Sequence, residues 1–369
     1  MYHWDRTLGP LSRAVVLPDA PQTNQRVLIS NSGGRIICLG AFDEVANASD
    51  PMFIVAGAEE SLTDFTIEPE GQDDVCEERL AVGSGIVTGV RTRAGIYIST
   101  DEAKYLMQED AIDVFRITKI SEGNASIGPN AMIEVDGTVY EMSQYKFMTF
   151  DGVVDELPCE VWQDVFAETV DNAPNPHVLD RSQLDKVYCW YNEKFSEIWW
   201  HYPSAGGSGE NDRYVVYNKQ ERCWYFGSID RTSARAPGPS YQLPFAFQSG
   251  GTFYLHESGV NDDVSPMSCH AESHDQQLGE GKNELQVSRA VPDLSRFLGS
   301  ISLFLKAKTW PRDSAYKVKG PYLITTTTRK KGVKIKGRQI AVRFESSTLG
   351  DDWRLGDWTF YAGEDSEGA

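Results

Sequence analysis

The sequence is poor in positive charge, in histidine and in long apolar runs, and each shortage narrows the range of functions. Its 369 residues include 35 Lys and Arg against 54 Asp and Glu, a net charge of −19, and only 6 His. A chain this acidic is not expected to wrap nucleic acid, because binding to phosphates depends on Lys and Arg replacing counterions. No run of about 18 uncharged apolar residues occurs, so no membrane insertion is expected.

Cysteine spacing and the N-terminal sequence exclude two further classes. No two of the six cysteines have the spacing Cys-x-x-Cys, and most lie in apolar runs. We therefore expect reduced thiols in a chain made in a cytoplasm. The first residues have neither the charged start nor the apolar stretch of a secretory signal. The cysteines are Cys38, Cys76, Cys159, Cys189, Cys223 and Cys269.

Positive charge is concentrated in one place near the C-terminus. Residues 301–369 hold 13 Lys and Arg against 8 Asp and Glu, the reverse of the rest of the chain. Lys334 and Lys336 alternate with Ile335, which places both on one side of a strand. A contact for an acidic protein neighbour, a nucleic-acid patch and a solvated face all remain open. The candidate contact residues are Arg329, Lys330, Lys331, Lys334, Lys336 and Arg338.

Residues 186–232 carry the clearest structural pattern in the chain. Four runs rich in β-branched and aromatic residues follow one another with only polar turns or a Gly/Ser loop between them. This pattern predicts a four-stranded antiparallel meander. Four Trp supply apolar bulk to both faces, as in a β-propeller blade packed between like sheets. The Trp residues are Trp190, Trp199, Trp200 and Trp224.

The same unit recurs along the chain. First-hairpin turns at intervals of 44 to 60 residues indicate five or so blades, and they fall near Ser32, Thr92, Asp136, Glu193 and Ser249. We therefore predict an all-β fold, with a propeller of four-stranded antiparallel blades over residues 1–265 and a small β-domain over residues 266–369. A short helix is expected at residues 159–169, a strand at 64–68 within a loop-like acidic stretch, and a single strand at 334–345.

No group of residues has the full pattern of a catalytic or metal site. His270 and His274 beside Cys269 have metal-binding residue types but no helix to bring them together. Gly281-Lys282 lacks the rest of a phosphate-binding loop. Glycosidases need two carboxylates across a sugar, and the adjacent pairs at 73–74, 262–263 and 351–352 are better explained as solvated loops. We therefore expect that the chain binds no metal and no cofactor, has no glycosidase activity and is not an enzyme.

Several segments resemble the tail hub or nozzle proteins of short-tailed bacteriophages, also called tail accessory or head-to-tail joining proteins. They include ASIGPNAMIEVDGTVYEMSQYKFMTFDG at 125–152, LPCEVWQDVF at 157–166 and NEKFSEIWWHYPSAGGSGENDRYVVYN at 192–218. The resemblance continues through GSIDRTS at 227–233, GPYLITTTTRK at 320–330 and GRQIAVRFESSTLGDDWRLGDWTF at 337–360. These segments extend over most of residues 80–369. Such proteins are commonly longer at the N-terminal side.

This resemblance implies a structural virion protein, assembled in the host cytoplasm and located in the viral tail. It implies a ring of copies, expected to number six, below a connector or adaptor protein and above a needle, spike, fibre or distal tail protein. DNA would pass through the ring only as cargo, and an acidic wall would repel its phosphates. The residues expected to face that channel are Glu68, Glu70, Asp73, Asp74, Glu210 and Asp212. The alternative is a propeller glycosidase or a lectin that acts on host glycan.

Overall fold

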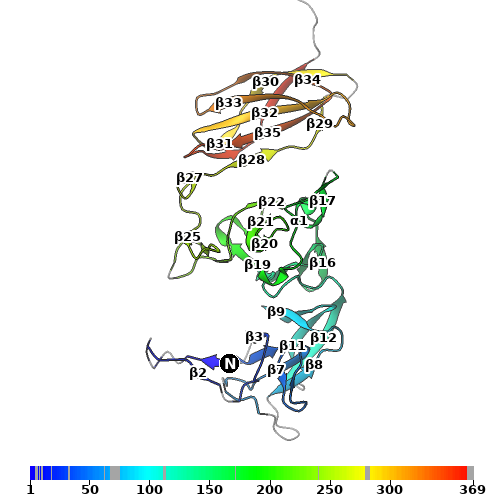
Figure 1. Cartoon of the computed structure of the whole chain (residues 1–369), viewed down its shortest axis with the longest axis vertical. Helices are drawn as coiled ribbons and strands as arrows, with labels where there is room; N and C mark the ends of the chain where they lie inside the picture. The colour runs from blue at the N-terminus through cyan, green and yellow to red at the C-terminus, as the bar shows by residue number, and fades with distance from the viewer. Residues whose placement is uncertain are drawn as a thin grey trace, which may run out of the picture. The chain divides into compact units, whose positions relative to one another are not determined.

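The computed structural model of the chain describes residues 1–363, apart from residues 5, 6, 8, 10, 18, 32, 33, 62, 67–74, 111–113, 171, 240 and 279–282. It divides into two compact units, Met1–His256 and Glu257–Ala369, called here the N-terminal and the C-terminal unit. Figure 1 colours the first from blue to yellow-green and the second from yellow to red. The sequence analysis placed this boundary later, at residue 265.

Four successive segments of the N-terminal unit each form a four-stranded antiparallel sheet, numbered one to four in chain order. In each sheet the strands pair in the order in which they occur along the chain. The first two sheets consist of β3 (Arg26–Ile29), β4 (Ile36–Leu39), β7 (Phe53–Ala56) and β8 (Cys76–Arg79), and of β9 (Ile86–Thr92), β10 (Gly95–Thr100), β11 (Ala103–Asp110) and β12 (Val114–Glu122). The third and fourth consist of β13 (Met132–Val135), β14 (Thr138–Met142), β15 (Phe147–Phe150) and β16 (Val154–Leu157), and of β19 (Tyr188–Asn192), β20 (Glu197–Pro203), β21 (Asn211–Asn218) and β22 (Cys223–Ser228).

A fifth sheet ends the N-terminal unit and has three strands, in the order β23-β24-β25. The sequence analysis expected its first hairpin near Ser249, which is the turn between the second and third of these strands. It missed the first strand, which is short and contains no large apolar residue. The strands are β23 (Ser233–Arg235), β24 (Phe245–Phe247) and β25 (Phe253–Leu255).

The tightest turn of the third sheet follows directly from its sequence. Asp136 and Gly137 connect β13 to β14, with φ angles of 54° and 91°. A two-residue turn with positive φ at both positions has the twist that antiparallel strands require, and Asp-Gly adopts it readily. The predicted strand limits on both sides agree with the structure.

In each of the first four sheets the inner strands are buried on both faces. In β10, Ile96 and Ile98 pack with the first sheet, whereas Tyr97 between them packs with the third. The third and fourth sheets meet around Trp200, whose ring centroid lies 4.8 Å from that of Phe147 and whose indole N–H donates to the Ala131 carbonyl at 3.1 Å. Burial on both faces explains the continuous apolar runs of these strands.

The C-terminal unit packs two sheets around one core. One sheet has the order β28-β35-β32-β33, with β29 also paired to β35, and the other has the order β34-β30-β37. Buried and half-buried residues alternate along β32, as expected for a strand with one face in a core. The strands of the unit are β26 (Asn261–Asp262), β27 (Ser265–Pro266), β28 (Cys269–Glu272), β29 (Gln276–Gln277), β30 (Leu285–Val291), β31 (Leu294–Leu298), β32 (Ser300–Lys308), β33 (Lys317–Thr325), β34 (Lys331–Gly337), β35 (Gln339–Ser346), β36 (Asp352–Leu355) and β37 (Thr359–Gly363).

The predicted fold class is confirmed: the chain is all-β, with four-stranded antiparallel blades of the propeller type followed by a small β-domain. Several strand predictions were wrong. Residues 64–66 form no strand, and the acidic stretch instead supplies β8, whose neighbour β7 was also missed. The predicted single strand at 334–345 is two strands, because the chain passes from one sheet to the other at Arg338.

The remaining elements of the N-terminal unit are short. Its α-helix, α1, covers Trp162–Phe166, and Val165 and Phe166 are buried against the third and fourth sheets. In the part of the chain that is described, no helix is long and apolar enough to span a bilayer. The other elements are β1 (Tyr2–His3), β2 (Val15–Val16), β5 (Phe42–Asp43), β6 (Ala48–Ser49), β17 (Thr169–Val170), β18 (Ala173–Pro174), η2 (Leu184–Lys186) and η3 (Glu193–Phe195).

Candidate functional site

The concentrated positive charge lies at one edge of the C-terminal unit. Strand β34 pairs with β30 and forms the edge of their three-stranded sheet. Val333 and Ile335 are buried in the core, whereas Lys334 and Lys336 are exposed. Since alternate side chains point to opposite faces of a strand, the two lysines project from the same outer face. Charge on an edge strand also discourages uncontrolled pairing with another sheet.

The six cations of this run divide into two groups. Among the described residues, no acidic side chain pairs with the first four, which run from Arg329 to Lys334. The last two have partners: Lys336 Nζ lies 4.0 Å from Glu284 Oε2, and the Arg338 guanidinium stacks 4.1 Å from the centre of the Trp310 ring. The first four therefore form a basic strand edge, Arg329, Lys330, Lys331 and Lys334, that is open to an acidic partner.

The acidic residues expected to face a channel are placed only in part. Glu210 Oε1 pairs with Lys186 Nζ at 2.8 Å. The Asp212 carboxylate accepts bonds from the Ser204 amide at 2.8 Å and from its hydroxyl at 2.7 Å, and so fixes the loop between β20 and β21. Glu68, Glu70, Asp73 and Asp74 lie outside the described residues.

The residues considered for chemistry do not form a reactive group. Among the described residues, no three His, Cys, Asp or Glu lie together as metal ligands, and His270 and His274 are both exposed. Asp262 and Asp263 occupy an exposed hairpin turn between β26 and β27. Asp351 accepts a bond from the Ser300 amide at 2.9 Å. The pair at 73–74 and Gly281-Lys282 lie outside the described residues.

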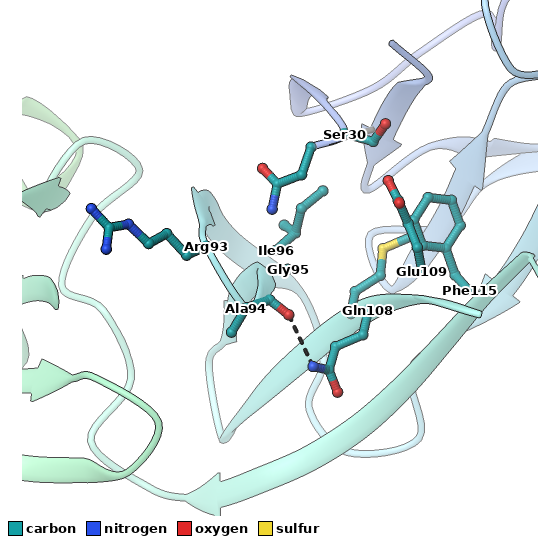
Figure 2. Close-up of a pocket in the computed structure, with 10 residues that line it drawn as sticks. Ser30, Arg93, Ala94, Gly95, Ile96, Gln108, Glu109 and Phe115 are labelled. Atoms are coloured by element: carbon teal, nitrogen blue, oxygen red, sulfur yellow. Dashed lines mark hydrogen bonds between the residues drawn. The ribbon is translucent and has the colours of Figure 1, made fainter. Parts of the chain in front are cut away.

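A pocket of about 210 Å³ lies where the first and second sheets meet. Figure 2 shows that Gln108 donates to the Ala94 carbonyl, at 2.9 Å, and that Arg93 extends away from Glu109. Among the described residues that line the pocket, Glu109 is the one carboxylate. The pocket is smaller than the roughly 300–1,000 Å³ of typical small-molecule sites, so it fits at most part of a ligand. Its lining residues are Ser30, Asn31, Arg93, Ala94, Gly95, Ile96, Met107, Gln108, Glu109 and Phe115.

A buried ion pair fastens the second sheet to the third. Lys104 of β11 and Glu141 of β14 form a salt bridge, with exposed fractions of 0% and 1%. The Tyr97 hydroxyl donates to the same carboxylate oxygen, Glu141 Oε2, at 3.0 Å. Burial raises the pKa of Glu141, although Lys104 acts against this shift, and burial lowers the pKa of Lys104. This site was not predicted from the sequence, because Lys104 and Glu141 are far apart in the chain and isolated charged residues are usually exposed.

A buried histidine lies where the fourth sheet meets the fifth. His201 is fully buried, stacks on Tyr188 at 4.8 Å, and accepts a bond from Trp190 Nε1 at 3.2 Å. Burial, with smaller contributions from His256 and Arg231, lowers its pKa to about 3. His201 is therefore neutral at physiological pH and serves as a hydrogen-bond acceptor within the core.

The fifth sheet presents a cluster of aromatic rings to solvent. Phe253 contacts Phe245 and Phe247 at 5.4 Å between ring centres, and Tyr241 contacts Phe245 at 5.2 Å. Phe247 is 40% exposed and Phe253 46%. Clustered exposed aromatic residues are typical of interaction sites. We call this surface the aromatic face, and its residues are Tyr241, Phe245, Phe247, Phe253 and Leu255.

Comparison with known proteins identifies no family. No protein-family model matches the sequence, and no curated protein matches it significantly. Among solved structures, the exo-β-1,3-galactanase of Phanerochaete chrysosporium with β-1,3-galactotriose matches at a TM-score of 0.30 and 9% identity, over 94% of this chain and 100% of that one. The same galactanase with galactose matches at 0.25 and 8%, over 91% and 100%. A glycoside hydrolase matches at 0.23 and 10%, over 91% and 83%.

These matches correct one expectation from the sequence. The chain was expected not to be an enzyme, but the solved structures to which it is similar are enzymes that cleave glycosides. At 8–10% identity and TM-scores of 0.30 or less, the likeness assigns neither a substrate nor catalytic residues to this chain.

Proposed function

We propose that the chain is a ring-forming subunit of the tail of a short-tailed bacteriophage, a hub or nozzle that extends the connector channel and anchors the distal tail parts. The resemblance described above supports this proposal, and its segments fall on core strands: residues 125–152 supply β13, β14 and β15, and residues 192–218 supply β20 and β21. In this role a connector or adaptor protein lies above the ring, and a needle, spike or fibre lies below it.

The observation that carries the proposal is the separation of charge along the chain. The chain has a net charge of −19, yet the basic strand edge has four cations without an acidic partner among the described residues. Copies of so acidic a protein repel one another unless local contacts are complementary. A basic strand edge that meets an acidic surface of the next copy supplies such a contact. The acidic remainder of the chain disfavours adhesion to DNA that passes through the ring.

Charge reversal at the basic strand edge tests this role. The triple variant Lys330→Glu, Lys331→Glu and Lys334→Glu should weaken association between copies at low salt, because each substitution turns an attraction into a repulsion. Native mass spectrometry and electron microscopy of the assembled chain would give the number of copies and show whether a channel is present. The same three substitutions at Arg312, Lys317 and Lys319 provide a control with an equal change in charge. An assembly that is unchanged in the first variant would contradict the contact.

A second candidate is recognition or hydrolysis of a host glycan. The pocket between the first and second sheets favours binding, since polar groups of Asn31, Gln108 and Glu109 line it beside Phe115. Hydrolysis by the usual route needs two carboxylates, and the described lining of this pocket supplies one. Glycan arrays and aryl glycosides, applied to the wild type and to Glu109→Gln, separate the candidates. Specific binding or turnover by the wild type that is lost in the variant would favour a function in glycan recognition or hydrolysis.

A further inference from the structure

The two faces of the fifth sheet differ sharply. Ala246 is fully buried, and Tyr254 lies under the Arg231 guanidinium at 4.2 Å, on the side that meets the fourth sheet. Phe247 and Phe253 are cross-strand partners on the opposite side, the aromatic face, and both are substantially exposed. Their neighbour Leu255 is 50% exposed. The fifth sheet is therefore covered on one face, whereas the inner strands of each preceding sheet are buried on both.

The aromatic face continues an interface that the chain already uses. The second sheet covers the first, the third covers the second, and the fourth covers the third, each through an apolar core. The fifth sheet also has three strands where the others have four, and the chain leaves the unit directly after β25. The series of stacked sheets thus ends in an apolar surface of the kind that binds another β-structure.

The opposite end of the series is covered by the N-terminal segment, residues 1–17. Leu17 packs in the core on the outer face of the first sheet, and its amide donates to the Met1 carbonyl at 3.1 Å. Outside this core, described residues of the segment expose apolar side chains: Tyr2 is 70% exposed, and its cross-strand partner Val16 is 56% exposed. Trp4 is 46% exposed. Each end of the series therefore presents exposed apolar side chains.

The scarcity of acidic residues in both surfaces favours a contact between them. Residues 232–255, which contain the aromatic face, include no Asp or Glu, and residues 1–17 include one, although the whole chain has 54. Two copies with a net charge of −19 meet with least repulsion where both surfaces have few acidic groups. Burial of the apolar area on both surfaces then makes the free energy of association favourable.

We propose that the aromatic face of one copy binds the N-terminal segment of a second copy. Such a contact joins two different surfaces, so each copy can bind one neighbour through its aromatic face and another through its N-terminal segment. Successive contacts then either close into a ring or extend as a filament. The inference rests on the proposed function and deepens it by naming the contact that joins the copies. It does not depend on the basic strand edge.

Complementation between two blocked variants tests the contact. One variant, Phe247→Glu with Phe253→Glu, blocks the aromatic face, and the other, Tyr2→Glu with Val16→Glu, blocks the N-terminal segment. At a salt concentration that screens the basic strand edge, we expect the wild type to form an oligomer larger than a dimer and each variant alone to be monomeric in native mass spectrometry. A mixture of the two should form a dimer and nothing larger, because one intact surface of each kind remains.

Controls separate this contact from other causes. Val264→Glu with Leu349→Glu makes the same change in charge at exposed apolar residues of the C-terminal unit and should assemble like the wild type. If circular dichroism shows that a Glu variant is unfolded, Phe253→Ser with Leu255→Ser replaces it. Variants that assemble like the wild type would overturn the contact and leave the ring proposal standing. A wild type that is monomeric at all concentrations would overturn both proposals.

Discussion

Replacing Lys104 with Met should lower the free energy of unfolding of the N-terminal unit by about 3–5 kcal/mol. The substitution keeps most of the side-chain volume but removes the ammonium group that pairs with Glu141. The carboxylate is then fully buried, with the Tyr97 hydroxyl as a donor, and it must either stay charged without a counterion or bind a proton. Urea unfolding followed by tryptophan fluorescence measures the change.

The double variant Lys104→Met with Glu141→Met should recover most of this loss. Two apolar side chains of similar volume often replace a buried ion pair at no cost, and what remains is the unpaired Tyr97 hydroxyl, worth about 1–3 kcal/mol. Adding Tyr97→Phe should recover that part too. Lys146→Met is the matched control, because its pair with Glu156 lies on the exposed side of the third sheet and should contribute less than about 1 kcal/mol. Equal losses for Lys104→Met and Lys146→Met would refute the role of the buried pair.

Much of the fold follows from short-range patterns in the sequence. The limits of β13 and β14 are predictable because Asp136-Gly137 fixes a turn and runs of mostly apolar residues lie on both sides of it. Strand β8 was missed because its sequence, CEER, is dominated by charge, and only pairing with β7 makes it a strand. The break between β34 and β35 was missed although the sequence carries a signal for it: the large apolar residues lie at odd positions up to Ile335 and at even positions from Ile340.

Some features of the candidate sites follow from local sequence patterns, and others depend on how the sheets pack. The common orientation of Lys334 and Lys336 follows from the period of two in a strand. The pairing of Lys104 with Glu141 depends on how two sheets pack, which no local pattern encodes. The aromatic face is a similar case: its phenylalanines resemble those of any buried strand, and only the number of sheets in the N-terminal unit decides that no further described sheet of that unit covers them.

Acid should destabilise the N-terminal unit through His201, by about 3 kcal/mol between pH 6.5 and pH 4.5. An unfolded chain protonates this histidine near pH 6.5, whereas in the folded chain its pKa is lowered to about 3. The unfolded state therefore binds more protons within this window. Stability is fully present above pH 6.5 and falls by about 1.4 kcal/mol for each unit below it. Unfolding free energies measured from pH 7.5 to pH 4.5 give this slope.

The difference between wild type and His201→Gln isolates this effect from the other titrating groups. Gln keeps an acceptor for Trp190 Nε1 but cannot be protonated, so the variant should be less sensitive to acid even if it is less stable at pH 7.5. The raised pKa of Glu141 acts in the opposite direction, but it contributes equally to both proteins and cancels. His274→Gln, at an exposed histidine of the C-terminal unit, should keep the wild-type slope. Parallel pH profiles for wild type and His201→Gln would mean that water reaches the imidazole, and the joint between the fourth and fifth sheets would then be open.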